Sequence, residues 1–181
     1  MGGFCISILN AENTKKNLFK TLSFIACSQP FTVHCYMMGI IVKQPETAEE
    51  YKQYLDLRWR VLRAPWGEPK GSEIDDIEDR CFHIMATVNK HVAGVGRLQY
   101  NSNIEAQIRY MAVDQAYEGK RIGRMIVNAL EQEARNRNIS CIVLDAREPV
   151  VGFYKKLGYS IEKKSYLLFD EIQHFRMSKR L

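Results

Sequence analysis

Two glycines flank two cations in the stretch YEGKRIGRMI, residues 117–126, where an apolar run gives way to a helical pattern. The first turn of a helix leaves about four backbone N–H groups without partners, and the aligned peptide dipoles add about half a positive charge there. A phosphate satisfies both needs. Gly119 permits close backbone approach or a positive φ, and Gly123 removes a side chain where a ligand or strand would press. The stretch therefore indicates an anion site, with a pyrophosphate as the expected ligand.

An ordinary helix start is the alternative interpretation of this stretch. Gly119 would then be a loop residue, and Lys120, Arg121 and Arg124 would be solvated instead of adding mobile cations to the site. The sequence has no GxxxxGK[ST] pattern and no GxGxxG after its first strand, so neither a P-loop nor a dinucleotide fingerprint is present.

The elements around this stretch are predicted as a strand at 105–113, a loop at 114–119, a helix at 120–137 and a strand at 141–145. An amphipathic stripe marks the helix, and its apolar positions are Ile122, Met125, Ile126, Ala129 and Leu130. Two i,i+4 pairs are expected on its solvated face, Glu131–Arg135 and Glu133–Arg137. The last strand is almost wholly apolar, which is typical of a strand covered on both faces.

The remaining elements follow from periodicity and breakers. A strand is predicted at 38–44, and a capping box of Thr47 and Glu50 starts a helix that ends near Pro65. Its apolar stripe is expected to be Tyr51, Leu55, Trp59 and Leu62. Residues 81–88 and 92–100 read as a hairpin. Pro149 starts a short helix that Gly158 closes, and two terminal strands follow.

Composition and charge exclude several classes of protein. The chain has 181 residues, 46% of them hydrophobic, and a net charge of only +5, which is too mild to argue for nucleic acid binding. The five cysteines have no CxxC spacing, and the four histidines have no metal-ligand spacing, so we expect no metal site and a reducing, cytoplasmic location. No apolar run approaches the roughly 20 residues that span a bilayer, so we expect no membrane partner.

Residues 1–37 differ from the rest of the chain because they lack sustained periodicity. They are interpreted as a poorly ordered N-terminal extension or as a stretch upstream of a true start at Met38, and residues 38–181 as one domain. A signal peptide is not indicated, because no charged region precedes a clean apolar core. Gly2 does not make a myristoylation site, since the motif requires Ser or Thr where Ile6 stands.

Two longer stretches, MAVDQAYEGKRIGRMIVNALEQEA and then LDAREPVVGFYKKLGY, resemble the GNAT superfamily of acetyl-CoA-dependent N-acetyltransferases. The first resembles the family's strand, pyrophosphate loop R/Q-x-x-G-x-G/A and helix, and the second its strand and short helix with F-Y-x-x-x-G-Y/F. Both occur in the family's order and at its separation, and the likeness covers roughly residues 38–181. LRWRVLRAPWG and FDEIQHFRM also resemble the ElaA-like branch.

The resemblance implies an α/β (mixed α+β) fold, with a mostly antiparallel, mixed sheet of about six to seven strands flanked by helices. It implies acetyl-CoA as the acyl donor. Backbone groups of Met111, Ala112 and Val113 would pair with the pantetheine arm like an added strand. Backbone amides of the loop and first helical turn would hold the pyrophosphate, namely those of Gly119, Lys120, Arg121, Ile122, Gly123 and Arg124.

Tyr154 would lie near the thioester sulfur and protonate the departing thiolate, since a phenol pKa near 10 matches a thiolate leaving group. From the residues alone, Tyr154 reads equally as a core aromatic. The acceptor would be an amine that attacks the acetyl carbonyl directly. Gln107 stands where some members place a base and cannot serve, so Glu105, His174 and a water chain remain as candidate bases.

The loop at 63–80 carries six acids, Glu68, Glu73, Asp75, Asp76, Glu78 and Asp79. Either it steers a cationic amine toward the acceptor site, or it is a solvated loop that caps a short helix. Trp66 would line the acceptor pocket or anchor the loop.

The sequence departs from the family's loop pattern at two positions. Glu118 replaces the usual Arg or Gln, and Arg121 replaces the next glycine; further on, Arg147 and Val150 replace residues that are often Asn and Ala. These changes make a non-catalytic acyl-CoA-binding regulator the main alternative to an enzyme. A basic nucleic-acid module is a second alternative, which the weak net charge disfavours. The sequence names no particular acceptor and leaves a homodimer open.

Overall fold

Eight strands form one sheet in the computed structural model, which describes residues 32–35 and 39–181. Their spatial order is β1-β2-β3-β4-β5-β6-β8-β7. Neighbouring strands are antiparallel except β5 and β6, which are parallel. The strands are β1 (Thr32–Cys35), β2 (Ile40–Lys43), β3 (Phe82–Val88), β4 (His91–Tyr100), β5 (Glu105–Val113), β6 (Cys141–Arg147), β7 (Ser160–Leu168) and β8 (Ile172–Arg180). The predicted mixed, mostly antiparallel sheet is confirmed, with β1 as a further strand.

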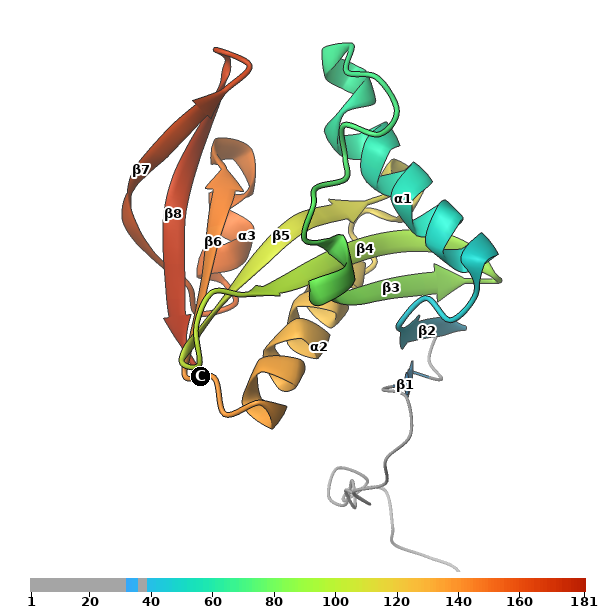
Figure 1. Ribbon diagram of the computed structural model, residues 1–181, viewed down its shortest axis with the longest axis horizontal. Coiled ribbons are helices and arrows are strands. Elements are labelled where there is room, and N and C mark those ends of the chain that lie inside the picture. The colour runs from blue at the N-terminus through green and yellow to red at the C-terminus, as the bar shows by residue number, and fades with distance from the viewer. Residues whose placement is uncertain (1–31, 36–38) are drawn as a thin grey trace, which may run out of the picture.

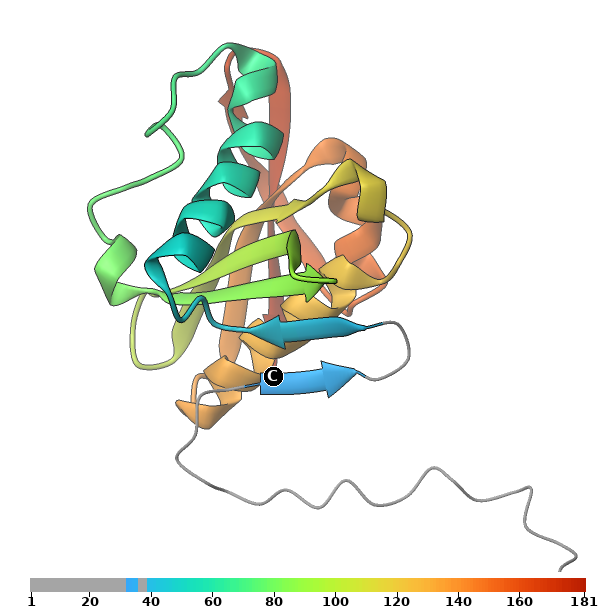
Figure 2. The same ribbon diagram turned by 90° about the vertical axis from the view of Figure 1, so that its right-hand side faces the viewer.

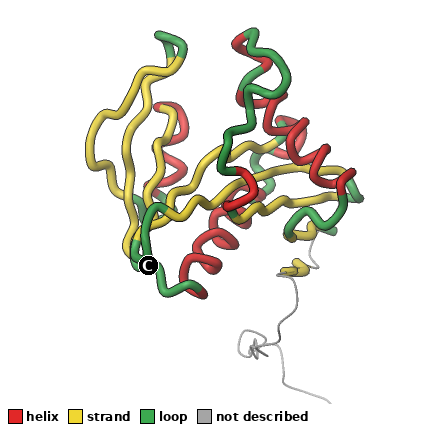
Figure 3. The backbone as a smooth tube through the Cα atoms, in the orientation of Figure 1, coloured by secondary structure: helices red, strands yellow, loops and turns green. Residues whose placement is uncertain are grey.

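Helices cover both faces of the sheet (Figures 1 and 3). They are α1 (Ala48–Leu62), α2 (Ile122–Asn136) and the short α3 (Val151–Lys155). Helix α1 packs on β4 and β5 from one side, and α2 packs on the same strands from the other side (Figure 2). Helix α3 contacts β6 and lies on the α2 side, where its Tyr154 joins the core of α2. Helix α1 is therefore the one helix of the three that lies on its face of the sheet.

The N-terminal segment is only partly described. Strand β1 pairs with β2, with Thr32 opposite Lys43. The rest of the predicted extension, residues 1–31 and 36–37, and the predicted strand start at Met38 lie outside the described residues. The domain boundary at residue 38 stays a prediction.

The start of α1 agrees with the prediction from the sequence, but the face that α1 buries does not. The Thr47 hydroxyl accepts the Glu50 amide as the cap requires, and the Glu50 carboxylate faces the amides of both Glu46 and Thr47, so the predicted pair of Thr47 and Glu50 caps the helix. The expected apolar stripe is only half-buried. The residues that point into the sheet are Tyr54, Leu57 and Arg58.

Helix α2 buries the stripe that periodicity predicted, with only Met125 half-buried. Two glycines of β4 allow this close approach, because a Cβ at Gly94 or Gly96 would lie 2.6 or 2.7 Å from an isoleucine methyl of α2. Both predicted i,i+4 pairs form. Glu131 was wrongly placed on the solvated face: it is buried, it pairs with Lys179 at 2.7 Å, and it accepts the Tyr159 hydroxyl.

Candidate active site

Strands β5 and β6 start side by side and then separate. They pair from Glu105 with Cys141 up to Ile108 with Leu144, while β6 continues to pair with β8 as far as Arg147. The two ribbons diverge beyond that point (Figure 1). Residues 109–113 of β5 therefore present an edge that has no strand partner on the β6 side among the residues that the structure describes. An extended ligand can add to such an edge by main-chain hydrogen bonds.

An irregularity in β5 sets the direction of this edge. Tyr110 has a positive φ of 51°, and the register between β4 and β5 shifts between Val95 and Arg97. After the bulge, Ala112 is buried on the α1 side, whereas Met111 and Val113 pack against the α2 side. This geometry places the predicted pantetheine-binding residues, Met111 to Val113, on the unpartnered part of the strand.

The loop between β5 and α2 presents unbonded amides, as an anion site needs. Within residues 39–181, no protein acceptor bonds the amides of Gly119, Arg121, Ile122, Gly123 or Arg124. Gly119 has a φ of 74° with open space around it, so its role is conformational. Because the loop is exposed on its outer side, these donors are accessible.

Arg121 adopts the backbone conformation of the glycine that it replaces. Its φ is 64°, in the left-handed region, where a side chain costs roughly 1 kcal/mol. It is the N-terminal flanking residue of α2 and makes no side-chain cap. Arg121 thus holds a backbone conformation that would suit a glycine at this position.

Gly123 joins the two sequence motifs. A Cβ at this position would lie 3.2 Å from the Phe153 ring of α3 and 3.6 Å from Val113 of β5. Gly123 therefore removes a side chain where another helix presses, as well as the expected strand. The contact brings Tyr154 next to the start of α2, because Phe153 and Tyr154 form an edge-on aromatic pair at 5.0 Å.

Tyr154 is buried in the core of the α2 side and also packs edge-on against Tyr159. No described residue hydrogen-bonds its hydroxyl, and burial raises the pKa of this phenol above its usual value of about 10. The group therefore carries its proton at neutral pH. An acid for a thiolate needs that proton, although a raised pKa makes its release more costly.

The predicted polar face of β5 is present on the α1 side of the sheet. Gln107 donates to Asp145 of β6 at 3.0 Å, and Glu105 lies 3.7 Å from Arg176 of β8. Glu105 sits where β5 and β6 are still paired, opposite Cys141. At about 3.3 Å per residue it is roughly 20 Å along the strand from Met111. This distance argues against Glu105 as the base.

His174 lies at the other end of the same face. It is opposite Arg147 in the β6–β8 ladder, where β6 has left β5, and its ring stacks on Tyr166 at 4.5 Å. Nδ1 is 2.9 Å from the Ile172 carbonyl, which suits an Nδ1–H donor and a free Nε2 lone pair. Burial lowers the pKa of His174 below its usual value, so the imidazole is neutral at pH 7.

The loop at 63–80 was predicted either to steer a cationic amine or to be a solvated loop that caps a short helix. Neither interpretation is right for all six of its acids. Asp75 forms two hydrogen bonds with Arg97, and Glu78 binds Arg97 and Arg58, both of which are fully buried. Glu73 is buried too, and its carbonyl accepts from Arg58. These acids hold the loop onto the sheet and are not free to steer a substrate. Neither Arg58 nor Arg97 was predicted from the sequence. The one signal was a cation at a core-facing position, in a helix for Arg58 and in a strand for Arg97.

Trp66 anchors its loop. Its ring stacks at 5.8 Å on Phe169, which lies in the turn between β7 and β8. The loop after α1 and the β7–β8 hairpin are thus joined above the face that carries His174.

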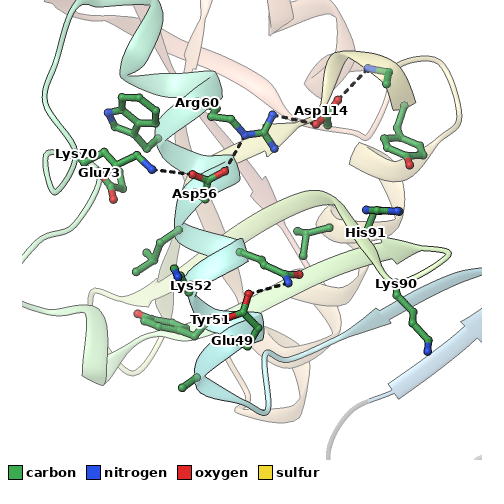
Figure 4. Close-up of a pocket in the computed structure, with 17 residues that line it drawn as sticks. Glu49, Tyr51, Lys52, Asp56, Arg60, Lys70, Glu73, Lys90, His91 and Asp114 are labelled. Carbon is green, nitrogen blue, oxygen red and sulfur yellow. Dashed lines mark hydrogen bonds and ion pairs between the residues drawn. The ribbon is translucent and has the colours of Figure 1, made fainter.

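A groove of about 950 Å³ lies elsewhere, between α1, the β3–β4 turn and residues 114–117 (Figure 4). Arg60 bridges Asp56 and Asp114 across it. Its charged lining residues balance, with the acids Glu49, Asp56, Glu73 and Asp114 against the bases Lys52, Arg60, Lys70 and Lys90. No residue predicted for catalysis or cofactor binding lines it. We therefore do not assign the groove to the reaction.

Two further properties concern the described residues alone. None of their helices has both the length and the apolar character needed to cross a membrane. Their histidines, cysteines and acids form no group that could hold a metal ion.

Known proteins resemble the chain in sequence and in fold. YjcF of Bacillus subtilis (strain 168), described as an uncharacterized N-acetyltransferase, is 27% identical over 143 residues, which cover 79% of this chain and 99% of the relative. An aminoglycoside 6'-N-acetyltransferase complexed with coenzyme A has a TM-score of 0.64 at 18% identity, covering 77% of this chain and 96% of that one. Escherichia coli ElaA has a TM-score of 0.66 at 17% identity, covering 79% and 99%.

The family model described as the acetyltransferase (GNAT) family matches residues 51–159. This range holds both motifs, the diverging pair of strands and the loop of unbonded amides. The chain therefore belongs to the acetyltransferase (GNAT) family of acetyl-CoA-dependent acyltransferases.

Proposed function

We propose that this protein transfers the acetyl group of acetyl-CoA to a primary amine by direct attack. One observation carries the proposal: the edge of β5 at 109–113, which has no partner strand on the β6 side among the described residues, leads toward the start of α2. There the amides of Gly119 and of residues 121–124 have no protein acceptor within residues 39–181. An extended arm that ends in a pyrophosphate matches this pair of features.

In this arrangement Met111 and Val113 offer main-chain groups to the pantetheine arm. The Asp114 amide donates to Ala93 on the β4 side, so by strand alternation the Val113 amide points to the open edge. The amides from Gly119 to Arg124 receive the pyrophosphate, and the exposed side chains of Lys120 and Arg124 add positive charge.

The reaction needs two proton transfers. The amine nitrogen attacks the acetyl carbonyl carbon, the new C–N bond forms, and the C–S bond breaks. A base takes the proton that the nitrogen loses, and the thiolate takes a proton from the Tyr154 hydroxyl. Support comes from Phe153, whose ring contacts Gly123 at the start of α2 and packs edge-on against Tyr154 at 5.0 Å.

We propose His174 as the base in preference to Glu105. His174 is neutral, keeps Nε2 available and lies where the strands have separated, whereas Glu105 lies where they are paired. A water chain remains the alternative to His174.

Tyr154→Phe tests the acid. We expect kcat to fall by roughly 10²-fold, while the Kd of acetyl-CoA from calorimetry changes little. Tyr100→Phe is the matched control, because its hydroxyl bonds Glu133 away from the site. Unchanged turnover in Tyr154→Phe would show that this tyrosine is not the acid.

A non-catalytic acyl-CoA-binding regulator is the second candidate, and Glu118 and Arg121 are the observation that favours it. A carboxylate beside a pyrophosphate is unfavourable, and Arg121 departs from the motif glycine. Acetyl-CoA binding without CoA release across a panel of amines would support the regulator.

We also propose a reducing, cytoplasmic location, since Cys81 and Cys141 are free thiols. The ElaA-like branch remains our proposal from the sequence of residues 57–67 and 169–177, because the likeness to ElaA at 17% identity supports the fold alone. A total thiol count of the native protein tests the first of these proposals.

A further inference from the structure

Three arginines without a carboxylate partner meet on the α1 face of the sheet. They are Arg63, which follows α1, Arg109 of β5 and Arg147 of β6. In the part of the chain that the structure describes, none of the three forms a salt bridge. We call them the arginine triad.

The contacts of each member place the triad at the mouth of the diverging strands. Arg109 follows the last β5 residue that pairs with β6, and Arg147 ends β6. Arg147 donates to the Leu62 carbonyl at the end of α1 at 3.3 Å, which brings it beside Arg63. The guanidinium carbons of Arg63 and Arg109 lie 5.8 and 5.2 Å from the centre of the Tyr110 ring.

Tyr166 marks the centre of this region. Burial and then Asp145 raise the pKa of its phenol, and the charges of Arg109, Arg63 and Arg147 act in the opposite direction. All three guanidiniums are thus close enough to act on one hydroxyl. Tyr166 also stacks on His174, the proposed base.

The acids around the triad are already engaged. Asp145 accepts from Gln107, from Ser165 at 2.7 Å and from Arg176 at 3.2 Å. Glu105 accepts from Asn101 and faces Arg176. Each member of the triad donates only to backbone carbonyls or makes no hydrogen bond within residues 39–181. The region therefore carries an excess of positive charge.

This arrangement is unfavourable for the protein alone. Burial, followed by the nearby charge of Arg63, lowers the pKa of Arg147 below its usual value. Like charges held together without counter-ions destabilise a fold. A ligand with a compact negative charge would supply that counter-ion, and a guanidinium fork fits a carboxylate with two parallel hydrogen bonds.

We propose that the arginine triad binds a carboxylate group of the acceptor, so that the preferred acceptors are amines that also carry a carboxylate, such as amino acids. The inference rests on the proposed acetyl transfer, because it assigns the triad to the acceptor side of that reaction. It replaces the expectation of a purely cationic acceptor, since the acids of the loop at 63–80 that face the sheet are occupied by Arg58 and Arg97.

Matched amines test the proposal. CoA release is measured with L-phenylalanine, L-phenylalaninamide and phenethylamine, and with glycine, glycinamide and methylamine. We expect kcat/KM for the carboxylate member of each series to exceed that of the amide by about tenfold or more. Phosphoethanolamine and ethanolamine form a further arm. Preference for phosphoethanolamine over every carboxylate would overturn the assignment of a carboxylate.

Variants connect the preference to the triad. Arg147→Gln and Arg109→Gln should each raise KM for the carboxylate members by about tenfold and bring them close to the amides, with the Kd of acetyl-CoA unchanged. Arg147→Lys should fall between, because lysine keeps the charge and loses the fork. Arg137→Gln, which removes an exposed arginine paired with Glu133, is the control. A carboxylate preference that survives both glutamine variants would overturn the proposal.

Equilibrium binding separates this inference from the proposed function. Titration of the protein saturated with CoA, followed by tryptophan fluorescence, should show L-phenylalanine binding about tenfold more tightly than its amide. Equal binding would overturn the inference even if acetyl transfer is confirmed. Conversely, a carboxylate preference that Arg147→Gln removes, in a protein that never releases CoA, would support the triad and contradict the proposed reaction.

Discussion

The ring of Tyr110 lies close to members of two groups of arginines that have opposite environments. Toward β4 lie Arg58 and Arg97, whose guanidinium carbons are 3.8 and 4.6 Å from the ring centre. Both are fully buried, and Asp75 and Glu78 neutralise them. Toward β6 lies the arginine triad, which is half-buried and has no carboxylate partner within the described chain. Within the described residues, a paired and an unpaired cluster of arginines thus meet at one ring.

The two clusters have different roles because their burial differs. A fully buried charge must have a partner inside the protein, since no ligand can reach it, and the paired cluster fastens the loop at 63–80 to the sheet. A half-buried charge is accessible to a ligand, which can supply the partner. The unpaired triad lies where the strands diverge and where His174 faces the same side, so we attribute it to binding and the paired cluster to folding.

Glu78→Ala should break the paired cluster and produce the largest effect. It leaves Arg58 and Arg97 buried with Asp75 as their one remaining carboxylate, and removing one partner of such a pair costs about 3–5 kcal/mol. Urea denaturation measures the change in the free energy of unfolding. Asp79→Ala, at the neighbouring exposed acid, is the control and should change stability by less than about 0.5 kcal/mol. Similar losses in both variants would mean that the loop tolerates no change.

Acid should weaken the paired cluster as well. Arg97 is the main cause that lowers the pKa of Asp75, so the folded protein holds this carboxylate ionised below the usual pKa of about 3.9. The stabilisation is therefore complete above about pH 5 and is lost as the pH falls through the folded-state pKa, by on the order of 2 kcal/mol. Asp75→Asn should be less stable at pH 7 and show a shallower loss between pH 5 and pH 2.

His83 and His174 also make the free energy of unfolding depend on pH. Their contribution is the same in Asp75→Asn and in the native protein, so it cancels when the two pH profiles are compared. Burial lowers the pKa of both His83 and His174, so their contribution is present above about pH 6.5 and declines as the pH falls. An identical acid profile in Asp75→Asn and the native protein would show that Asp75 is not the group that titrates.

The same contrast explains what the sequence could predict of the fold. The stripe of α2 and the hairpin of β3 and β4 came from simple periodicity, because apolar residues alone decide them. The buried face of α1 could not be predicted, since it turns a cation, Arg58, toward the sheet. Such burial is stable only because Glu78, twenty residues away, meets it in space.

For the site, local sequence motifs sufficed to predict the part that would bind its ligand through backbone groups. The loop from Gly119 to Gly123 is recognisable because glycine positions and a helix start set the direction of its amides. The arginine triad draws its members from α1, β5 and β6, so its convergence depends on tertiary structure. Arg147 gave one local signal, since it stands where the family often has asparagine.

Arg147→Met should show that the unpaired triad costs stability. The substitution removes a half-buried cation near Arg63, so we expect the free energy of unfolding to rise by about 1 kcal/mol while the carboxylate preference is lost. Arg97→Met is the matched variant in the paired cluster and should lose about 3 kcal/mol. If the two clusters differ in this way, the change in the free energy of unfolding has opposite signs in Arg147→Met and Arg97→Met. If the free energy of unfolding of Arg147→Met instead falls by more than about 1 kcal/mol, Arg147 belongs with the structural arginines.

Arg121→Gly extends the comparison to an arginine outside both groups, which takes a left-handed φ of 64° without a side-chain cap. Glycine relieves that conformation but gains freedom in the unfolded chain, so we expect a net stabilisation of only about 0.5 kcal/mol. Because the amides do the binding in our proposal, the Kd of acetyl-CoA should change by less than about threefold. Lys120→Ala, which removes a neighbouring cation without relieving a positive φ, separates charge from backbone shape. A tenfold weaker Kd in Arg121→Gly alone would mean that the guanidinium of Arg121 holds the phosphates, and the loop would then join the triad as a site built on an unpaired arginine.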